Sequence, residues 1–185
     1  MSTREEAIKL LHEWVESESL RKHCLSVACA MEGYARKNNL SDEDAEKWFI
    51  AGLLHDFDYE KYPDINLHPK MGCEELERLG YDVEIIEAIM GHNSATGVAR
   101  KSKMAKALFA VDELCGLIVA LSKVRPLGFE GMSVESVERA LKKKEFAKNV
   151  SREDIEQGIL ELGADRKEHF TIVINSLAAH SSELK

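Results

Sequence analysis

Apolar residues recur at three- and four-residue spacing along almost the whole chain, and this periodicity limits the fold more than any other feature. Only three prolines and eleven glycines interrupt the 185 residues, and no alternating apolar and polar run of strand length stands out. The observed spacing places apolar side chains on one face of an α-helix. We therefore predict an all-α protein that folds as a helical bundle.

Capping signals mark the ends of the expected helices. Thr3 with Glu6 fits a capping box, Ser41 can cap a helix that starts with acidic residues, and Pro69 suits a first turn. The longest and most apolar predicted helix ends before Pro126. The helices are expected at residues 3–15, 20–37, 41–56, 68–80, 82–92 and 101–124, with two or three more within 133–180.

A loop at residues 126–132 contains proline and glycine and separates a more apolar part, residues 1–125, from a more polar part, residues 126–185. The polar part has too few apolar residues for an independent core. We therefore expect a single domain, in which residues 126–185 form additional C-terminal helices packed on residues 1–125.

Composition excludes several classes of protein. Apolar and charged fractions of 44% and 31% are ordinary for a globular protein, and the net charge of -8 argues against nucleic acid as a partner. No run approaches eighteen apolar residues and the start is acidic and amphipathic, so neither a membrane span nor a secretory signal is expected. The four cysteines lack CxxC spacing, which favours reduced thiols in a cytoplasmic protein.

Four polar residues fall on apolar helical stripes: His23, His55, Asp56 and Asp112. A buried histidine alone is more often a packing residue than a ligand. A buried carboxylate, however, needs a cation, a set of donors or a metal, because leaving it ionised and unpaired is costly. Two such carboxylates with few basic residues nearby in sequence favour a metal site.

Adjacent His55 and Asp56 point about 100° apart on a helix, so they can share an ion only near the helix end. The other ligands, His23 and Asp112, must then come from facing helices, as in the core of a helical bundle. This mixture of imidazole and carboxylate suits divalent Mn, Fe, Co, Ni or Zn better than Ca.

These residues, in this order, resemble the motifs of the HD-domain superfamily of metal-dependent phosphohydrolases. The segment AGLLHDFD (51–58) resembles the central motif, and HPKMGCEEL (68–76) resembles the His-x-x-x-Gly-Ala-Glu-x-Leu segment of HDIG-type members. The segment IIEAIMGHN (85–93) resembles their next helix, which ends in histidine, and the resemblance spans roughly residues 20–120.

The resemblance implies an HD-domain-like bundle in which His23, His55, Asp56 and Asp112 are metal ligands. It further implies that His68 and His92 support a second ion bridged through the position of Asp56. From their sequence positions alone, His68 could instead simply start a helix, and His92 could interact with the carbonyl end of its own helix.

The chain also departs from the family pattern. Phe57, Asp58 and Tyr59 stand where Ile-Gly-Lys is usual, and His-Asn stands at 92–93 where many binuclear members have His-His. Lys61 is near enough in sequence to replace the missing lysine. Asp58 could support a ligand, bind metal or act as a general base, but a solvated carboxylate in a loop is the simplest expectation.

The function implied is a metal-dependent phosphohydrolase that acts on a nucleotide or another small phosphate ester. Asp58 or His92 could accept a proton, and Lys61, Lys70 or the basic segment 100–103 could bind phosphate, although that segment is more simply a solvated helix start.

Two alternatives stay open: a binuclear-iron oxygenase on the same scaffold, and a non-catalytic metal-stabilised module that binds a ligand or partner. A homo-oligomer is compatible with the sequence. His169 and His180 are expected at the surface or in packing.

Overall fold

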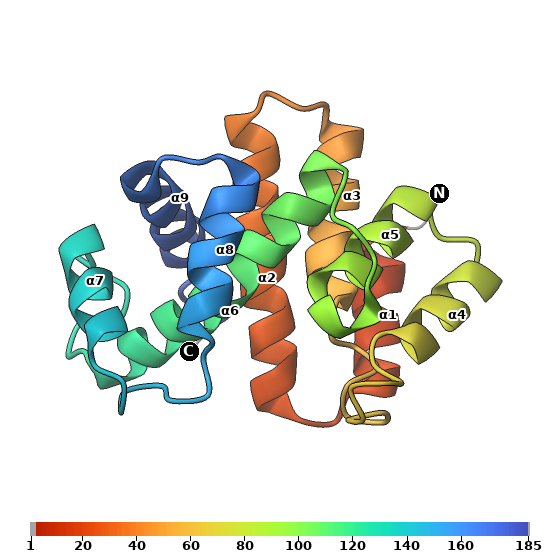
Figure 1. Cartoon of the computed structure of the whole chain (residues 1–185), viewed down its shortest axis with the longest axis horizontal. Helices are drawn as coiled ribbons and strands as arrows, with labels where there is room; N and C mark the ends of the chain where they lie inside the picture. Colours follow the sequence, from red (N-terminus) through yellow and green to blue (C-terminus); the bar gives the residue numbers. More distant parts are fainter. Residues whose placement is uncertain (1–2, 185) are drawn as a thin grey trace.

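The computed structural model describes residues 3–184 and contains only helices there, with no strand, so the all-α prediction is confirmed. Figure 1 shows the helices arranged as a bundle around α2, α3 and α6. The α-helices are α1 (Arg4–Trp14), α2 (Glu18–Lys37), α3 (Asp42–Leu54), α4 (Lys70–Arg78), α5 (Val83–His92), α6 (Lys103–Val124), α7 (Val134–Lys142), α8 (Arg152–Leu162) and α9 (Arg166–Ala179); one 3-10 helix, η1, spans Ser94–Thr96.

The helix ends follow the capping signals closely. Thr3 and Glu6 form the expected capping box on α1, and the Ser41 side chain accepts a hydrogen bond at the start of α3. The predicted helix 41–56 is two residues too long, because α3 ends at Leu54. Beyond it, the His55 Nδ1 donates a hydrogen bond to the Gly52 carbonyl (2.8 Å), which turns the imidazole towards the inside of the bundle.

A close crossing of α2 and α3 fixes the relative position of the first site residues. A Cβ atom added to Gly52 would lie 2.7 Å from the Ala28 Cα, so only glycine permits this approach of the two backbones. The helices run in opposite directions, which brings His23 on α2 beside His55 at the end of α3. Their imidazole ring centroids are 5.1 Å apart.

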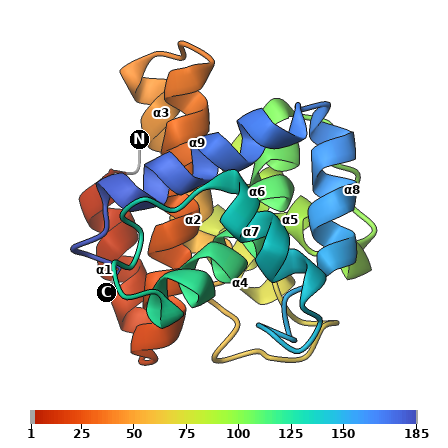
Figure 2. The ribbon, with the colours of Figure 1, turned by 90° about the vertical axis from the view of Figure 1, so that its left-hand side faces the viewer.

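The helices after residue 125 pack on α6 and α2 and contribute to the same apolar core (Figure 2). A Cβ on Gly158 of α8 would lie 2.6 Å from the Ala110 Cα of α6, so these helices also approach closely. His169 of α9 is fully buried, where it accepts a hydrogen bond from the Tyr34 hydroxyl and donates one from Nε2 to the Ala110 carbonyl (3.1 Å). This histidine joins α9 to both α2 and α6, a packing role as expected.

His180 ends α9 and lies 3.1 Å from Glu183, near the surface. The four cysteines are all buried and free. Within residues 3–184, no helix combines the length and apolar character needed to cross a membrane.

Candidate metal centre

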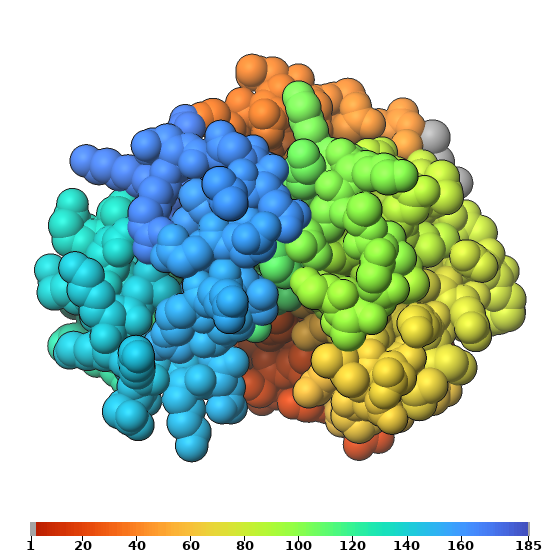
Figure 3. All heavy atoms as spheres, viewed as in Figure 1, coloured from red at the N-terminus to blue at the C-terminus, as the bar shows by residue number. Residues whose placement is uncertain are grey.

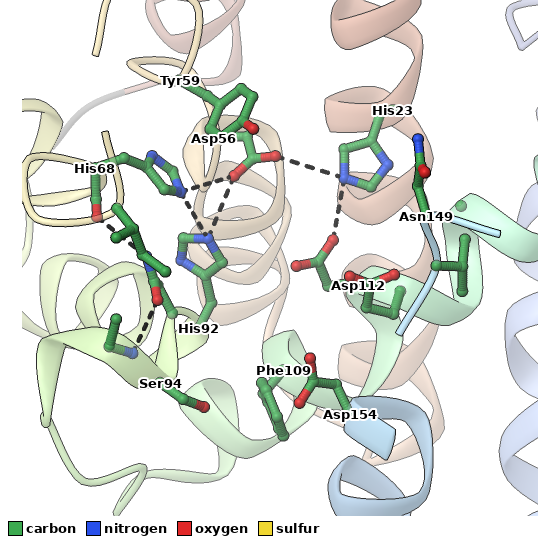
Figure 4. Close-up of a pocket in the computed structure, with 16 residues that line it drawn as sticks. His23, Asp56, Tyr59, His68, His92, Ser94, Phe109, Asp112, Asn149 and Asp154 are labelled. Atoms are coloured by element: carbon green, nitrogen blue, oxygen red, sulfur yellow. Dashed lines mark hydrogen bonds and ion pairs between the residues drawn. The ribbon is translucent and has the colours of Figure 1, made fainter. Parts of the chain in front are cut away.

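Six side chains from separate parts of the chain converge beside a cavity; five of them line it (Figure 4), and the sixth, His55, is fully buried next to them. They come from α2, the turn after α3, the loop before α4, the end of α5 and the middle of α6. They are the six ligands expected from the resemblance: His23, His55, Asp56, His68, His92 and Asp112.

The first cluster joins His23, His55, Asp112 and one oxygen of Asp56. His23 Nε2 lies 3.0 Å from Asp112 Oδ1 and 3.3 Å from His55 Nε2, and His55 Nε2 lies 3.4 Å from Asp112 Oδ1. Asp56 Oδ2 is 3.5 Å from His55 Nε2 and 3.8 Å from His23 Nε2. Two imidazole nitrogens and two carboxylate oxygens therefore face one small volume.

The second cluster uses the other oxygen of the same aspartate. Asp56 Oδ1 lies 3.2 Å from His68 Nε2 and 3.3 Å from His92 Nε2, and these two nitrogens are 3.3 Å apart. Asp56 therefore stands between the clusters with one carboxylate oxygen directed to each.

Hydrogen bonds on the far side of three imidazoles determine which nitrogen is free. The Nδ1 atoms of His55 and His92 donate to the carbonyls of Gly52 (2.8 Å) and Ile89 (2.5 Å), and His68 Nδ1 donates to Asp58 (2.7 Å). A neutral imidazole carries one N–H, so each of these rings presents a bare Nε2 lone pair to the clusters. Lone pairs that converge with carboxylate oxygens favour a shared cation, either protons on the imidazoles or a metal ion that replaces them.

The spacing of these atoms fits a transition-metal ion. Around an ion with nitrogen and oxygen bonds of about 2.1 Å, neighbouring ligand atoms lie about 3.0 to 3.4 Å apart. Most of the distances within each cluster are in this range, and only those from Asp56 Oδ2 are longer. The donor set is the imidazole and carboxylate mixture that suits Mn, Fe, Co, Ni or Zn.

The electrostatics of the site also favour positive charge there. Burial disfavours a charged His55, but the carboxylates of Asp56 and Asp112 outweigh it and raise the pKa of this imidazole to about 9. Burial likewise disfavours a charged His68, but Asp56 and Asp58 outweigh it and raise the pKa of this imidazole to about 9. Burial would raise the pKa of Asp56 and Asp112, yet the facing imidazoles hold both well below their usual range.

Asp58 is not the solvated loop carboxylate that the sequence favours. It is fully buried, and its two oxygens accept hydrogen bonds from His68 Nδ1 (2.7 Å) and from the Gly72 N–H (2.8 Å). The loop closes over it because His68 and Gly72, both within the HPKMG segment, converge on one carboxylate. Asp58 therefore orients His68 and does not itself face the cavity, which leaves it no access to a substrate proton.

The basic residues considered for phosphate binding do not line the cavity. The Lys61 ammonium lies over the Trp14 ring, 3.9 Å from its centroid, and Lys70 is exposed at the start of α4. Arg100 forms a two-pronged ion pair with Glu161 (2.7 and 2.8 Å) and stacks on Phe109. Each cation thus already has a different partner or faces solvent.

Asn93 stands where a second histidine is usual. Its Nδ2 donates to the His68 carbonyl (3.1 Å) and its Oδ1 accepts from the Ala95 N–H (2.9 Å). These bonds connect the end of α5 to the loop that carries His68. Asn93 therefore helps to position the second cluster, although it also lines the cavity.

The cavity extends well beyond the six ligands, with a volume of about 560 Å³. In Figure 3 a hollow separates the segment around α8 from the segment that carries α4 and α5. Sequence reasoning missed its second wall, which includes Glu113, Asn149 and Asp154. Of these three residues, only Glu113 is marked in the sequence, as a second acidic residue next to Asp112 on an apolar helix. Burial and the neighbouring Asp112 raise the pKa of Glu113 to about 7.

Comparison with known proteins identifies the family. A family model for the HD domain matches residues 20–117, just over half of the chain, and this segment contains all six converging side chains. No curated protein and no solved structure matches this chain. The match and the geometry of the clusters lead to one conclusion: the chain belongs to the HD-domain superfamily, whose members are mostly metal-dependent phosphohydrolases.

Proposed function

We propose that the protein is a metal-dependent phosphohydrolase that cleaves a small phosphate ester. The observation that carries this proposal is the convergence of imidazole Nε2 atoms and carboxylate oxygens in two clusters that share Asp56. The clusters open into a cavity of about 560 Å³, large enough for a small organic phosphate.

In the proposed reaction, a water oxygen bonds to phosphorus while the bond from phosphorus to the ester oxygen breaks. The proton of the water ends on the alcohol that leaves. Divalent ions held by these residues would supply Lewis acidity for the phosphoryl oxygens and lower the pKa of the attacking water. Residues of both clusters line the cavity, so a phosphate ester bound there would lie against them.

The chain's own residues then have distinct roles. His23, His55 and Asp112 would hold one ion, His68 and His92 would hold a second, and Asp56 directs one carboxylate oxygen to each cluster. The backbone and carboxylate acceptors behind His55, His68 and His92 keep each ring rigid, which preserves the alignment of water and phosphorus.

The test begins with metal-depleted protein loaded in turn with Mn, Co, Ni, Zn and Fe(II). We expect phosphatase or phosphodiesterase activity on a panel of small phosphate esters with at least one ion. Asp112→Asn should lower that activity by at least about 100-fold, whereas His180→Gln, a change near the surface away from the clusters, should leave it intact.

Two results would redirect the proposal. Absence of hydrolysis with every ion and every ester, in protein that binds metal and is folded, would refute it and favour a binding module. Oxygen uptake upon addition of a substrate to the iron-loaded protein, without phosphate release, would instead favour the binuclear-iron oxygenase.

A further inference from the structure

The cavity has two chemically different parts. Metal ligands line one part, and Glu113, Asn149 and Asp154 contribute to a wall beside His23 and Asp112, where Figure 4 shows Asn149 and Asp154. Among the described residues, no lysine or arginine lines the cavity in either part. A substrate bound at the metal clusters through its phosphate would therefore extend towards acidic and amide groups, without a protein cation.

Glu113 and Asp154 retain oxygens for a ligand. One Glu113 oxygen accepts a hydrogen bond from the Ser151 N–H (2.9 Å), and its other oxygen has no partner among residues 3–184. In the same part of the chain, the Asp154 side chain has no hydrogen bond or ion pair, since only its backbone N–H is bonded, to Ser151 Oγ (3.1 Å). Both side chains are only partly exposed.

The segment that forms this wall is held in place by protein contacts. The Arg152 guanidinium donates to the carbonyls of Ala147 (2.6 Å) and Val150 (2.8 Å), and also to that of Phe146. The hydrogen bond from Ser151 to Glu113 then joins the start of α8 to α6. Asp154 is therefore positioned on the same helix pair that presents Asp112.

An ordinary structural reason exists for one acidic residue at this place. Carboxylates are favourable in the first turn of a helix, and both Glu153 and Asp154 are in the first turn of α8. Glu153, however, is exposed and does not line the cavity, whereas Asp154 does. Comparing substitutions of Glu153 and Asp154 therefore distinguishes an effect on helix stability from an effect on binding in the cavity.

We propose that this wall selects a phosphate ester whose alcohol part carries an ammonium or similar cationic group. The inference rests on the proposed phosphohydrolase function and names its substrate class. A cation placed between Glu113 and Asp154 would gain charge-assisted hydrogen bonds from oxygens that have no protein partner. A second phosphate or a carboxylate in the same place would face the Asp154 carboxylate and find no lysine or arginine, so polyphosphorylated nucleotides should be poor substrates.

The test uses three non-hydrolysable probes of similar size on the metal-loaded protein. These are 2-aminoethylphosphonate, propylphosphonate and 3-phosphonopropanoate, whose far ends are cationic, neutral and anionic. Calorimetry should give Kd values that increase in that order, with the ammonium probe bound about tenfold more tightly than the neutral one. Equal Kd values for the first two, or tighter binding of the anionic probe, would overturn the inference.

Variants then assign the preference to the wall. Asp154→Asn should reduce the ratio of the two Kd values by about threefold, since Glu113 remains, and Glu153→Gln, its neighbour outside the cavity, should keep the wild-type ratio. Glu113→Gln, which can still accept from Ser151, gives a second measurement if Asp154→Asn folds poorly. An unchanged ratio in both cavity variants would refute the assignment.

Turnover distinguishes failure of this inference from failure of the function. If 2-aminoethyl phosphate and propyl phosphate are hydrolysed with the same kcat/KM, the protein is a phosphohydrolase without the proposed selectivity. If neither these esters nor any other on the panel is hydrolysed, the proposed function itself fails.

Discussion

Replacing Asp58 by asparagine should weaken both the fold and the second cluster, because only a carboxylate can serve the two donors that face it. Asp58 accepts from His68 Nδ1 and from the Gly72 N–H, and it is fully buried. Asparagine has one oxygen acceptor, so its NH2 group must face one of these N–H donors. A buried donor left unpaired costs about 1 to 3 kcal/mol, and we expect the free energy of unfolding to fall by that amount.

The same change should reduce metal affinity. Groups that orient a ligating histidine are worth about 10- to 100-fold in metal affinity, or roughly 1.4 to 2.8 kcal/mol. Because Asp58 contacts His68 and none of His23, His55 or Asp112 through a hydrogen bond, the loss should be confined to the second cluster. Calorimetric titration with Zn or Mn should then show one affinity preserved and one weakened.

The effect on the metal-free protein also has a predicted sign with pH. Asp56 and Asp58, against burial, raise the pKa of His68 to about 9 from an ordinary value of 6.5. A raised pKa contributes stability that is complete below pH 6.5 and is lost as the pH rises through 9. The difference in stability between wild type and Asp58→Asn, measured by urea unfolding, should therefore be larger at pH 6 than above pH 9.

Asp42→Asn provides the control, because it removes an aspartate charge at an exposed position. It should change neither the free energy of unfolding by more than about 0.5 kcal/mol nor the metal titration. The reasoning would be refuted if Asp58→Asn kept both wild-type metal affinities and wild-type stability at pH 6.

Three further perturbations test other parts of the structure. Zn or Mn at 100 times its Kd should stabilise the protein by about 2.7 kcal/mol, and a melting temperature unaffected by metal and chelator would contradict this. Metal binding should also release protons below pH 9, since His55 has a pKa of about 9 and must be neutral to bind. Burial lowers the pKa of His169 to about 4, so its contribution to stability should fall on acidification from pH 6.5 to 4 by at most about 1.4 kcal/mol per pH unit. The free energy of urea unfolding should therefore depend less on pH in His169→Gln than in wild type, and an equal pH dependence would exclude His169 as its origin. Gly52→Ala should destabilise the protein by about 1 to 3 kcal/mol in thermal unfolding, because its Cβ would meet the Ala28 backbone at 2.7 Å. Gly116→Ala, whose Cβ would lie 3.6 Å from Val150, should be tolerated, and equal effects of the two changes would refute the close crossing of α2 and α3.

The helices were predictable because their signals are local. Apolar spacing and side-chain caps such as Thr3 and Ser41 act within a few residues of each helix end, and the structure follows them there. The end of α3 was not predicted, because it depends on the His55 ring turning back to the Gly52 carbonyl. Periodicity alone could not distinguish that turn from two more helical residues.

The environment of Asp58 was less accessible from sequence because distant residues create it. The segment from Phe57 to Pro69 has no helical period, and Asp58 becomes buried only when His68 and Gly72 close on it. Lys61 is near the site in sequence, yet its ammonium lies over the ring of Trp14 at the end of α1. Proximity along the chain was therefore a poor guide in this loop.

The second wall of the cavity depends on packing between distant segments. Asp154 reaches the cavity because α8 docks on α6, and that docking requires Gly158 to lie directly against Ala110. In sequence, Asp154 is only one of two acidic residues in a helix's first turn. Its role could be inferred only after the helices had been placed.

The position of Asp56 between the clusters has a consequence for how metal is acquired. Both clusters draw on the negative charge of this one side chain, so an ion in either cluster weakens the attraction of the other for a second ion. The cluster with Asp112 has a second carboxylate of its own and should fill first. Under metal scarcity the protein should exist in a one-ion form, in which His68 is still able to carry a proton. The external metal concentration would then select between two chemical states of the same fold.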